Sequence, residues 1–128
     1  MTVFVETDFL FAIAKDDDWL QNRAEEVLND HEVVTSPFAY LELLIILESH
    51  QFNYVRLFAN LLDIVPVGNE EEQQLVLKAV AYFEGGMTPF DSFHAATAET
   101  RGLSIVSSGK TYRDVDGERL PLEPETDE

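Results

Sequence analysis

The stretch MTPFDSFHAATA, residues 87–98, guides the interpretation of the rest of the chain. It begins like a helix, because Thr88 is a favoured N-cap residue and Pro89 suits the first helical position. Asp91 then stands at the third helical position, where an acid completes a capping box and lies at the positive end of the helix dipole. One interpretation is that Asp91 only caps its helix. The other, which depends on acids elsewhere in the chain, is that it belongs to a functional site.

Small residues follow Asp91 at helical spacing. His94, Ala95 and Ala98 stand three, four and seven positions later, and this spacing predicts one face suited to close packing. We therefore interpret His94 as a packing histidine on this face and not as a ligand.

The composition indicates one folded domain with a large excess of acid. The chain has 128 residues, of which 45% are hydrophobic, so extensive disorder is excluded. We expect a single domain over residues 1–123 and a frayed acidic tail over 124–128. There are 25 acidic and 8 basic residues, for a net charge of −17. Because the acids are scattered along the chain, we favour adaptation to concentrated salt, and a halophilic archaeal source, over a merely acidic mesophile.

This charge limits how the chain could bind nucleic acid. The sequence has no basic patch, so it does not predict binding through neutralisation of phosphates by Lys and Arg. At molar salt, however, the screening length falls to about 3 Å, and repulsion between acids and phosphates becomes short-ranged.

Several classes of protein are disfavoured by what the sequence lacks. It has no cysteine, hence no disulfide, no thiolate metal site and no cysteine nucleophile. No apolar run has the length of a membrane span, and the first residues have no basic region typical of a secretion signal. We expect a cytoplasmic protein without membrane contact.

The hydrophobic pattern predicts alternating strands and helices. We expect strands at 2–5, 33–35, 63–67, 103–106 and 119–122, and helices at 9–14, 19–29, 38–47, 52–62, 70–83 and from Pro89 until Gly102. Asp18 and Asn69 are candidate N-caps of the second and fifth helices. Strands that alternate with helices imply a parallel α/β sheet covered by helices on both faces.

The helix at 38–47 contains an anomaly. It is apolar all round except at Glu42, and a helix of this kind is buried. An unpaired buried carboxylate costs several kcal/mol, so Glu42 should be protonated, paired with a cation or bound to a metal. The alternative is that Glu42 reaches solvent at the edge of the helix.

Two further acids, Glu6 and Asp8, follow the first strand. The alternative roles are a solvated strand end for Glu6 and a helix N-cap for Asp8. The carboxyl ends of parallel strands are, however, where open α/β sheets place ligands. We therefore expect Glu6, Asp8, Glu42 and Asp91 to share one acidic pocket, in which oxygen ligands suit Mg²⁺ or Mn²⁺.

Four blocks of the chain, in order and spacing, resemble the landmark blocks of PIN-domain ribonucleases, which include VapC-type toxins. The blocks are VETDFL (5–10), SPFAYLELL (36–44), TPFDSFHAATA (88–98) and LSIVSSGK (103–110). The resemblance implies a PIN-like three-layer sandwich, with a central parallel sheet of four to five strands and helices on both faces.

The resemblance also implies a function. Members of this family bind Mg²⁺ or Mn²⁺ through carboxylates, and a metal-activated water cuts an RNA phosphodiester. A cognate antitoxin protein and a homodimer would be the expected partners. By position in the blocks, the resemblance implies that Glu6, Glu42 and Asp91 are the catalytic acids. It implies that the same three acids, together with Asp8, are the metal ligands. Thr7, Ser107 and Ser108 would lie beside the cofactor.

The chain departs from the family pattern at two acids, and this leaves alternatives open. The first acid is Glu6 instead of aspartate, and Gly109 stands where the fourth acid is usual. A degenerate PIN module that binds RNA or a protein partner without cutting is therefore one alternative. A receiver-like phospho-acceptor domain is another alternative. Such a domain would require an aspartate at the end of the third strand, but Val67 and Gly68 stand there.

Overall fold

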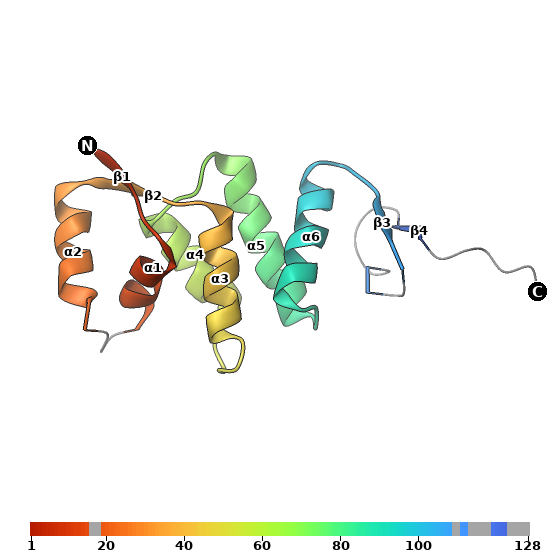
Figure 1. The fold of residues 1–128 in the computed structure, drawn as a ribbon, viewed down its shortest axis with the longest axis horizontal. Coiled ribbons are helices and arrows are strands. Elements are labelled where there is room, and N and C mark those ends of the chain that lie inside the picture. The colour runs from red at the N-terminus through yellow and green to blue at the C-terminus, as the bar shows by residue number, and fades with distance from the viewer. Residues whose placement is uncertain (16–18, 109–110, 113–118, 123–128) are drawn as a thin grey trace, which may run out of the picture.

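The computed structural model of this chain describes residues 1–15, 19–108, 111–112 and 119–122. Figure 1 shows its helices packed side by side, with β1 and β2 along one edge and with β3 and β4 beyond α6 at the other end. The described elements are, in chain order, β1 (Thr2–Phe4), α1 (Thr7–Ala14), α2 (Gln21–Asp30), β2 (Glu32–Val34), α3 (Pro37–Leu47), α4 (Tyr54–Ile64), α5 (Glu70–Glu84), α6 (Pro89–Thr100), β3 (Ile105–Ser107) and β4 (Arg119–Pro121).

Helix α3 is the centre of the hydrophobic core. It packs against α1, α5 and α6, and more than half of its residues are buried. The Tyr40 hydroxyl, fully buried, donates a 2.6 Å hydrogen bond to the Val65 carbonyl, and the Tyr40 ring lies 5.8 Å from that of Phe58. Burial raises the pKa of Tyr40 well above its usual value. Although α3 is strongly apolar, no helix within the described ranges is both long and apolar enough to cross a membrane.

The strands pair in parallel, as predicted, but they form two separate sheets among the described residues. β1 pairs with β2, and β3 pairs with β4. A single parallel bridge between Thr35 and Val67 extends the first sheet. The strand predicted at 63–67 is reduced to this bridge, because its first residues continue α4 to Ile64.

The predicted central sheet of four to five strands, and with it the three-layer sandwich, is therefore not formed in the described part of the chain. After α6 the chain turns at Gly102, whose φ of +64° is in the region that favours glycine. β3 then lies apart from β1 and pairs with β4 instead (Figure 1). The mixed α/β class is confirmed, whereas the continuous sheet stays a prediction.

The helix starts show which local signals were reliable. Asn69 accepts a 2.9 Å hydrogen bond from the Glu72 N–H, and Thr88 accepts one of 3.3 Å from the Asp91 N–H, so both predicted caps are confirmed. Asp8 is not an N-cap, because α1 begins one residue earlier, at Thr7. The predicted cap Asp18 and the predicted tail 124–128 lie outside the described residues.

The buried bond of Tyr40 gives a test of this core. In Tyr40→Phe the Val65 carbonyl loses its donor inside the core, so we expect a loss of about 1–3 kcal/mol in the free energy of unfolding. Urea unfolding of both proteins measures the difference. Thr2→Val is the control, because it removes an exposed bond to Glu32 and should change stability by less than about 0.5 kcal/mol. Equal midpoints for Tyr40→Phe and the wild type would mean that the carbonyl finds another partner.

Candidate functional site

Glu42 lies on a solvent-exposed stripe of α3. Phe38, Glu42 and Ile46 follow one another at four-residue spacing and share one face of the helix. Phe38 is 75% exposed, Ile46 is 47% exposed, and Glu42 is also exposed. The prediction that Glu42 is buried is wrong, and its alternative, a carboxylate at the edge of the helix, is correct. Because Glu42 is exposed, water solvates its carboxylate, and the requirement of a buried charge for a cation does not apply.

Thr7 connects the first acidic segment to Glu42. Its hydroxyl lies 3.0 Å from Glu42 Oε1, to which it donates, and 3.4 Å from the Ala39 carbonyl. Thr7 is itself buried, at the first position of α1. The packing of α1 on α3 thus brings the predicted residue Thr7 into contact with a predicted acid, over 35 positions of sequence.

Glu6 and Asp8 take different directions from Thr7. Successive helical residues diverge by about 100° around the axis, so neighbours at the start of α1 face different surroundings. Glu6 occupies the N-cap position and is exposed. Asp8 is also exposed and lines a cavity of about 140 Å³ with Arg23 and other residues of α1 and α2. Asp8 thus lies towards α2, whereas Thr7 lies towards α3.

Asp91 has a hydroxyl partner of its own. It is half-buried at the start of α6, and the Tyr112 hydroxyl donates a 3.1 Å hydrogen bond to its Oδ1. Burial, then this hydrogen bond and the charge of Asp91, raise the pKa of Tyr112 to about 12. Sequence reasoning did not identify Tyr112. The available signal was an aromatic residue with a polar tip close behind the fourth block, since a buried tyrosine hydroxyl needs a partner.

Ser107 contacts both Ser108 and β4. The Ser107 hydroxyl donates to the Ser108 carbonyl at 3.1 Å. The Ser107 carbonyl accepts from Arg119 Nη2 at 2.6 Å and from the Leu122 N–H at 2.9 Å. The next residue in this block, Gly109, lies outside the described residues.

The acids fit a metal ion in kind but not in placement. Carboxylate oxygens are suitable ligands for Mg²⁺ and Mn²⁺. Across residues 1–15, 19–108, 111–112 and 119–122, however, no group of three or more Asp, Glu, His or Cys side chains is placed to hold a metal ion. The expected convergence of Glu6, Glu42 and Asp91 on one pocket is therefore not seen there. Their catalytic and metal-binding roles stay predictions.

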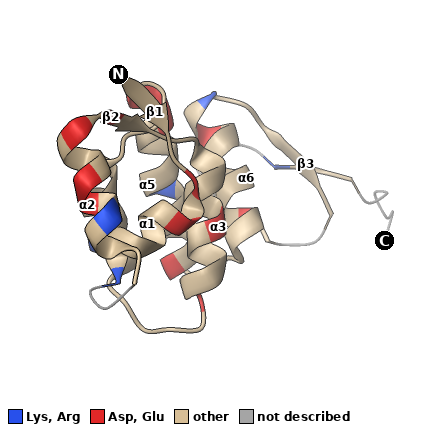
Figure 2. Ribbon diagram, turned by 60° about the vertical axis from the view of Figure 1, so that its left-hand side comes forward, with Lys and Arg blue, Asp and Glu red and all other residues tan. Residues whose placement is uncertain are grey.

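The charge of the surface follows the composition. Figure 2 shows Asp and Glu on several separate elements, with few Lys and Arg among them. Two ion pairs join described residues, Arg23 with Glu26 at 2.9 Å and Lys78 with Glu99 at 3.2 Å. In the part of the chain that the structure describes, the excess acid is thus spread over several elements.

Comparison with known proteins identifies the family. A family model, the PIN domain, matches residues 3–118. No curated protein and no solved structure matches the chain. The matched range contains all four sequence blocks, including Glu6, Glu42 and Asp91.

The bond between Tyr112 and Asp91 can be tested by titration. In Asp91→Asn the negative charge is lost, so the pKa of Tyr112 should fall from about 12 part of the way to its ordinary 10.0. It should not fall completely, because burial is the largest cause of the shift. The measurement is the ultraviolet absorbance of phenolate against pH. Subtracting the curve of Tyr112→Phe isolates Tyr112 from Tyr40 and Tyr54, whose pKa values are also raised.

The same shift has a consequence for stability. Because the pKa of Tyr112 is higher in the folded chain than in the unfolded one, its contribution is complete below pH 10 and is lost as the pH rises towards 12. The unfolding free energy of the wild type should fall more steeply over this range than that of Tyr112→Phe. Parallel curves would show that Tyr112 titrates alike in both states.

Proposed function

Since the chain belongs to the PIN-domain family, we propose that it is a metal-dependent endoribonuclease of the VapC type, which hydrolyses RNA phosphodiesters. The observation that carries the proposal is the family match over residues 3–118. The proposed catalytic acids are Glu6, Glu42 and Asp91.

Mg²⁺ or Mn²⁺ is the proposed cofactor, with Asp8 as an additional ligand beside the three catalytic acids. When bound, such an ion supplies an activated water and stabilises the charge on the reacting phosphate. The support from this chain is that every proposed ligand is a carboxylate, the ligand type that hard cations prefer. Thr7, Ser107 and Ser108 are the proposed polar neighbours of the ion.

Two hydroxyl groups orient the proposed acids. Thr7 donates to Glu42, and Tyr112 donates to Asp91, so one oxygen of each carboxylate is engaged by a hydroxyl group. The Thr88 cap fixes the first turn of α6 and with it the backbone of Asp91. These residues would limit the rotation of the carboxylates and keep them in position for a ligand.

We also propose that β3 adds to the unpaired edge of β1 in the active form, giving the continuous parallel sheet. A sheet of two strands is only marginally stable, and an unpaired strand edge offers free N–H and C=O groups. β1 pairs on one side with β2 and has no second partner strand among the described residues. Such an addition would bring Ser107 and Ser108 closer to the end of β1, where Glu6 and Asp8 follow.

The proposed cellular setting follows from the family and the charge. The proposed partners are a cognate antitoxin and a second copy of the chain, and the proposed location is the cytoplasm. A net charge of −17 supports activity in concentrated salt, as in a halophile, because screening there removes much of the repulsion within the chain and towards RNA.

A PIN module that binds RNA or a protein without cutting is the second candidate function. It is favoured by Gly109 at the position of the usual fourth acid. It is also favoured by the finding that the described residues contain no metal-binding group of three.

The nuclease proposal predicts cleavage of RNA that depends on Mn²⁺ and on Glu42. In molar KCl the wild type should cut single-stranded RNA when Mn²⁺ is added, and Glu42→Gln should lower the rate by at least about a hundredfold, since it removes a ligand charge. Glu48→Gln is the control, because it changes an exposed acid just beyond the same helix and should leave the rate unchanged. Equal cleavage by Glu42→Gln and the wild type would remove Glu42 from the site.

Gly109→Asp tests whether the fourth block faces the proposed metal ligands. If the fourth block faces the metal ligands, the added carboxylate should tighten Mn²⁺ binding, measured by calorimetry, and raise the rate of RNA cleavage. Asp tolerates a left-handed conformation, so its backbone cost should be on the order of 1 kcal/mol even if Gly109 requires one. A folded Gly109→Asp protein that binds Mn²⁺ no better and cuts no faster would show that position 109 lies away from the site.

A further inference from the structure

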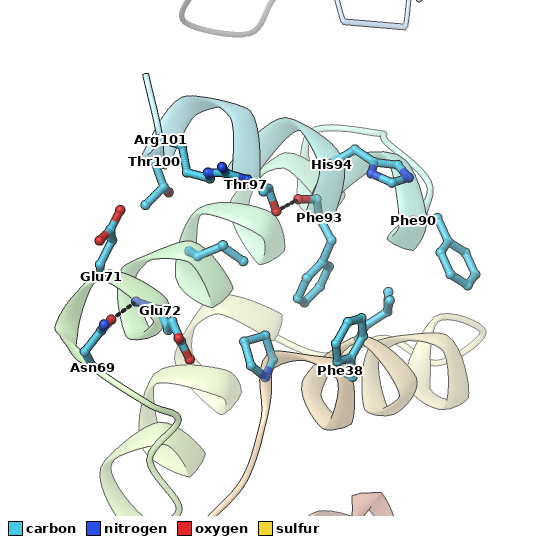
Figure 3. A pocket seen from close by; sticks show the side chains of 13 residues that line it. Phe38, Asn69, Glu71, Glu72, Phe90, Phe93, His94, Thr97, Thr100 and Arg101 are labelled. Atoms are coloured by element: carbon cyan, nitrogen blue, oxygen red, sulfur yellow. Dashed lines mark hydrogen bonds between the residues drawn. The ribbon is translucent and has the colours of Figure 1, made fainter. Parts of the chain in front are cut away.

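A groove lined by aromatic residues lies between α3, α5 and α6. Its volume is about 710 Å³, which is within the range of about 300–1,000 Å³ typical of ligand sites. Figure 3 shows Phe93 and Phe38 projecting into it from α6 and α3, with Phe90 beside them. Phe38 is 75% and Phe90 is 59% exposed, whereas Phe93 is only 8% exposed and forms the wall. Two large aromatic side chains thus stand in water at the mouth of a cavity.

None of the proposed catalytic acids lines the groove, but residues close in sequence to Glu42 and Asp91 do. Phe38 lies one helical turn before Glu42 on the same exposed face of α3. Phe90 directly precedes Asp91, and His94 follows Asp91 by one turn of α6. His94 was expected to pack inward, but it is exposed and lines the groove, while Ala95 and Ala96 are buried. Close sequence neighbours of both acids thus line the groove.

Charge indicates which forces could hold RNA here. The groove contains Arg101 and His94 as its basic side chains, together with Glu71 and Glu72 at the end near Arg101. With a net charge of −17, the chain cannot gain much affinity from phosphate neutralisation. Stacking of a base on an aromatic ring needs no charge and is independent of sequence.

We propose that unpaired bases of RNA stack on Phe38 and Phe90, and that this stacking positions the strand beside Glu42 and Asp91. The inference rests on the proposed function for its substrate class. Double-stranded RNA would not bind in this way, because its bases are stacked on one another and are not available to side chains. Phe38 and Phe90 are positioning residues and take no part in the reaction itself.

Binding without cleavage tests the proposal. A fluorescent single-stranded RNA is titrated in chelator, so that no metal supports cutting, and its anisotropy is measured with the wild type, Phe38→Ala and Phe90→Ala. Each substitution should weaken binding roughly 5- to 150-fold, as expected for the loss of one stacked base. Phe38→Trp should restore it, and Trp19→Ala is the matched control, since it removes an aromatic residue that is 86% exposed and away from the groove. Thermal melts establish that every variant is folded.

The dependence on salt separates stacking from phosphate binding. If stacking holds the RNA, the affinity should change little between dilute and molar KCl, or should rise as repulsion is screened. Each phosphate contact would instead give a slope of about −0.7 in log affinity against log salt.

The proposal is overturned if the wild type binds no single-stranded RNA, if it prefers the duplex, or if both alanine variants bind as well as the wild type. It is also overturned if these variants only convert a dimer to a monomer in sedimentation, which would make the groove a protein interface. Binding through Phe38 and Phe90 without any Mn²⁺-dependent cleavage would refute the nuclease and retain the stacking surface.

Discussion

The burial of α3 is the constraint on which the structure depends. Its buried side chains, Tyr40 above all, lie between α1, α5 and α6, where a polar group has little access to water. The hydrogen bond from Tyr40 to the Val65 carbonyl satisfies two such groups at once and joins α3 to the end of α4. Because buried polar groups without partners are costly, this bond fixes how α3 is rotated about its axis. That rotation decides which residues of α3 face water.

The exposed stripe of α3 connects the core to the candidate site. With Tyr40 turned inward, Phe38 and Glu42 face outward, one helical turn apart. Glu42 then meets Thr7 of α1. Asp91 is held in a corresponding way by Tyr112, which approaches from beyond α6. In both cases a hydroxyl group from a distant part of the chain contacts the acid.

The acidity of the chain and its membership of a nuclease family are compatible if RNA is held by uncharged contacts. Electrostatic attraction of RNA requires an excess of basic residues, whereas this chain has 8 basic against 25 acidic residues. Exposed aromatic rings beside the acids offer an alternative source of affinity, one that molar salt does not weaken. Salt would at the same time screen the repulsion between the chain's carboxylates and the phosphates.

The sequence by itself determined the local features: the caps at Asn69 and Thr88, the parallel pairing of strands and the PIN-domain family. These follow from residues that are close in sequence, or from motifs whose spacing is preserved. Only the tertiary structure decided that Glu42 is exposed, that Tyr112 reaches Asp91 and that β3 pairs with β4. Nearly every side chain of α3 is apolar, so periodicity could not indicate which face is covered. Partners 21 and 35 positions apart, as in the pairs Asp91–Tyr112 and Thr7–Glu42, are chosen by helix packing, which no local pattern encodes.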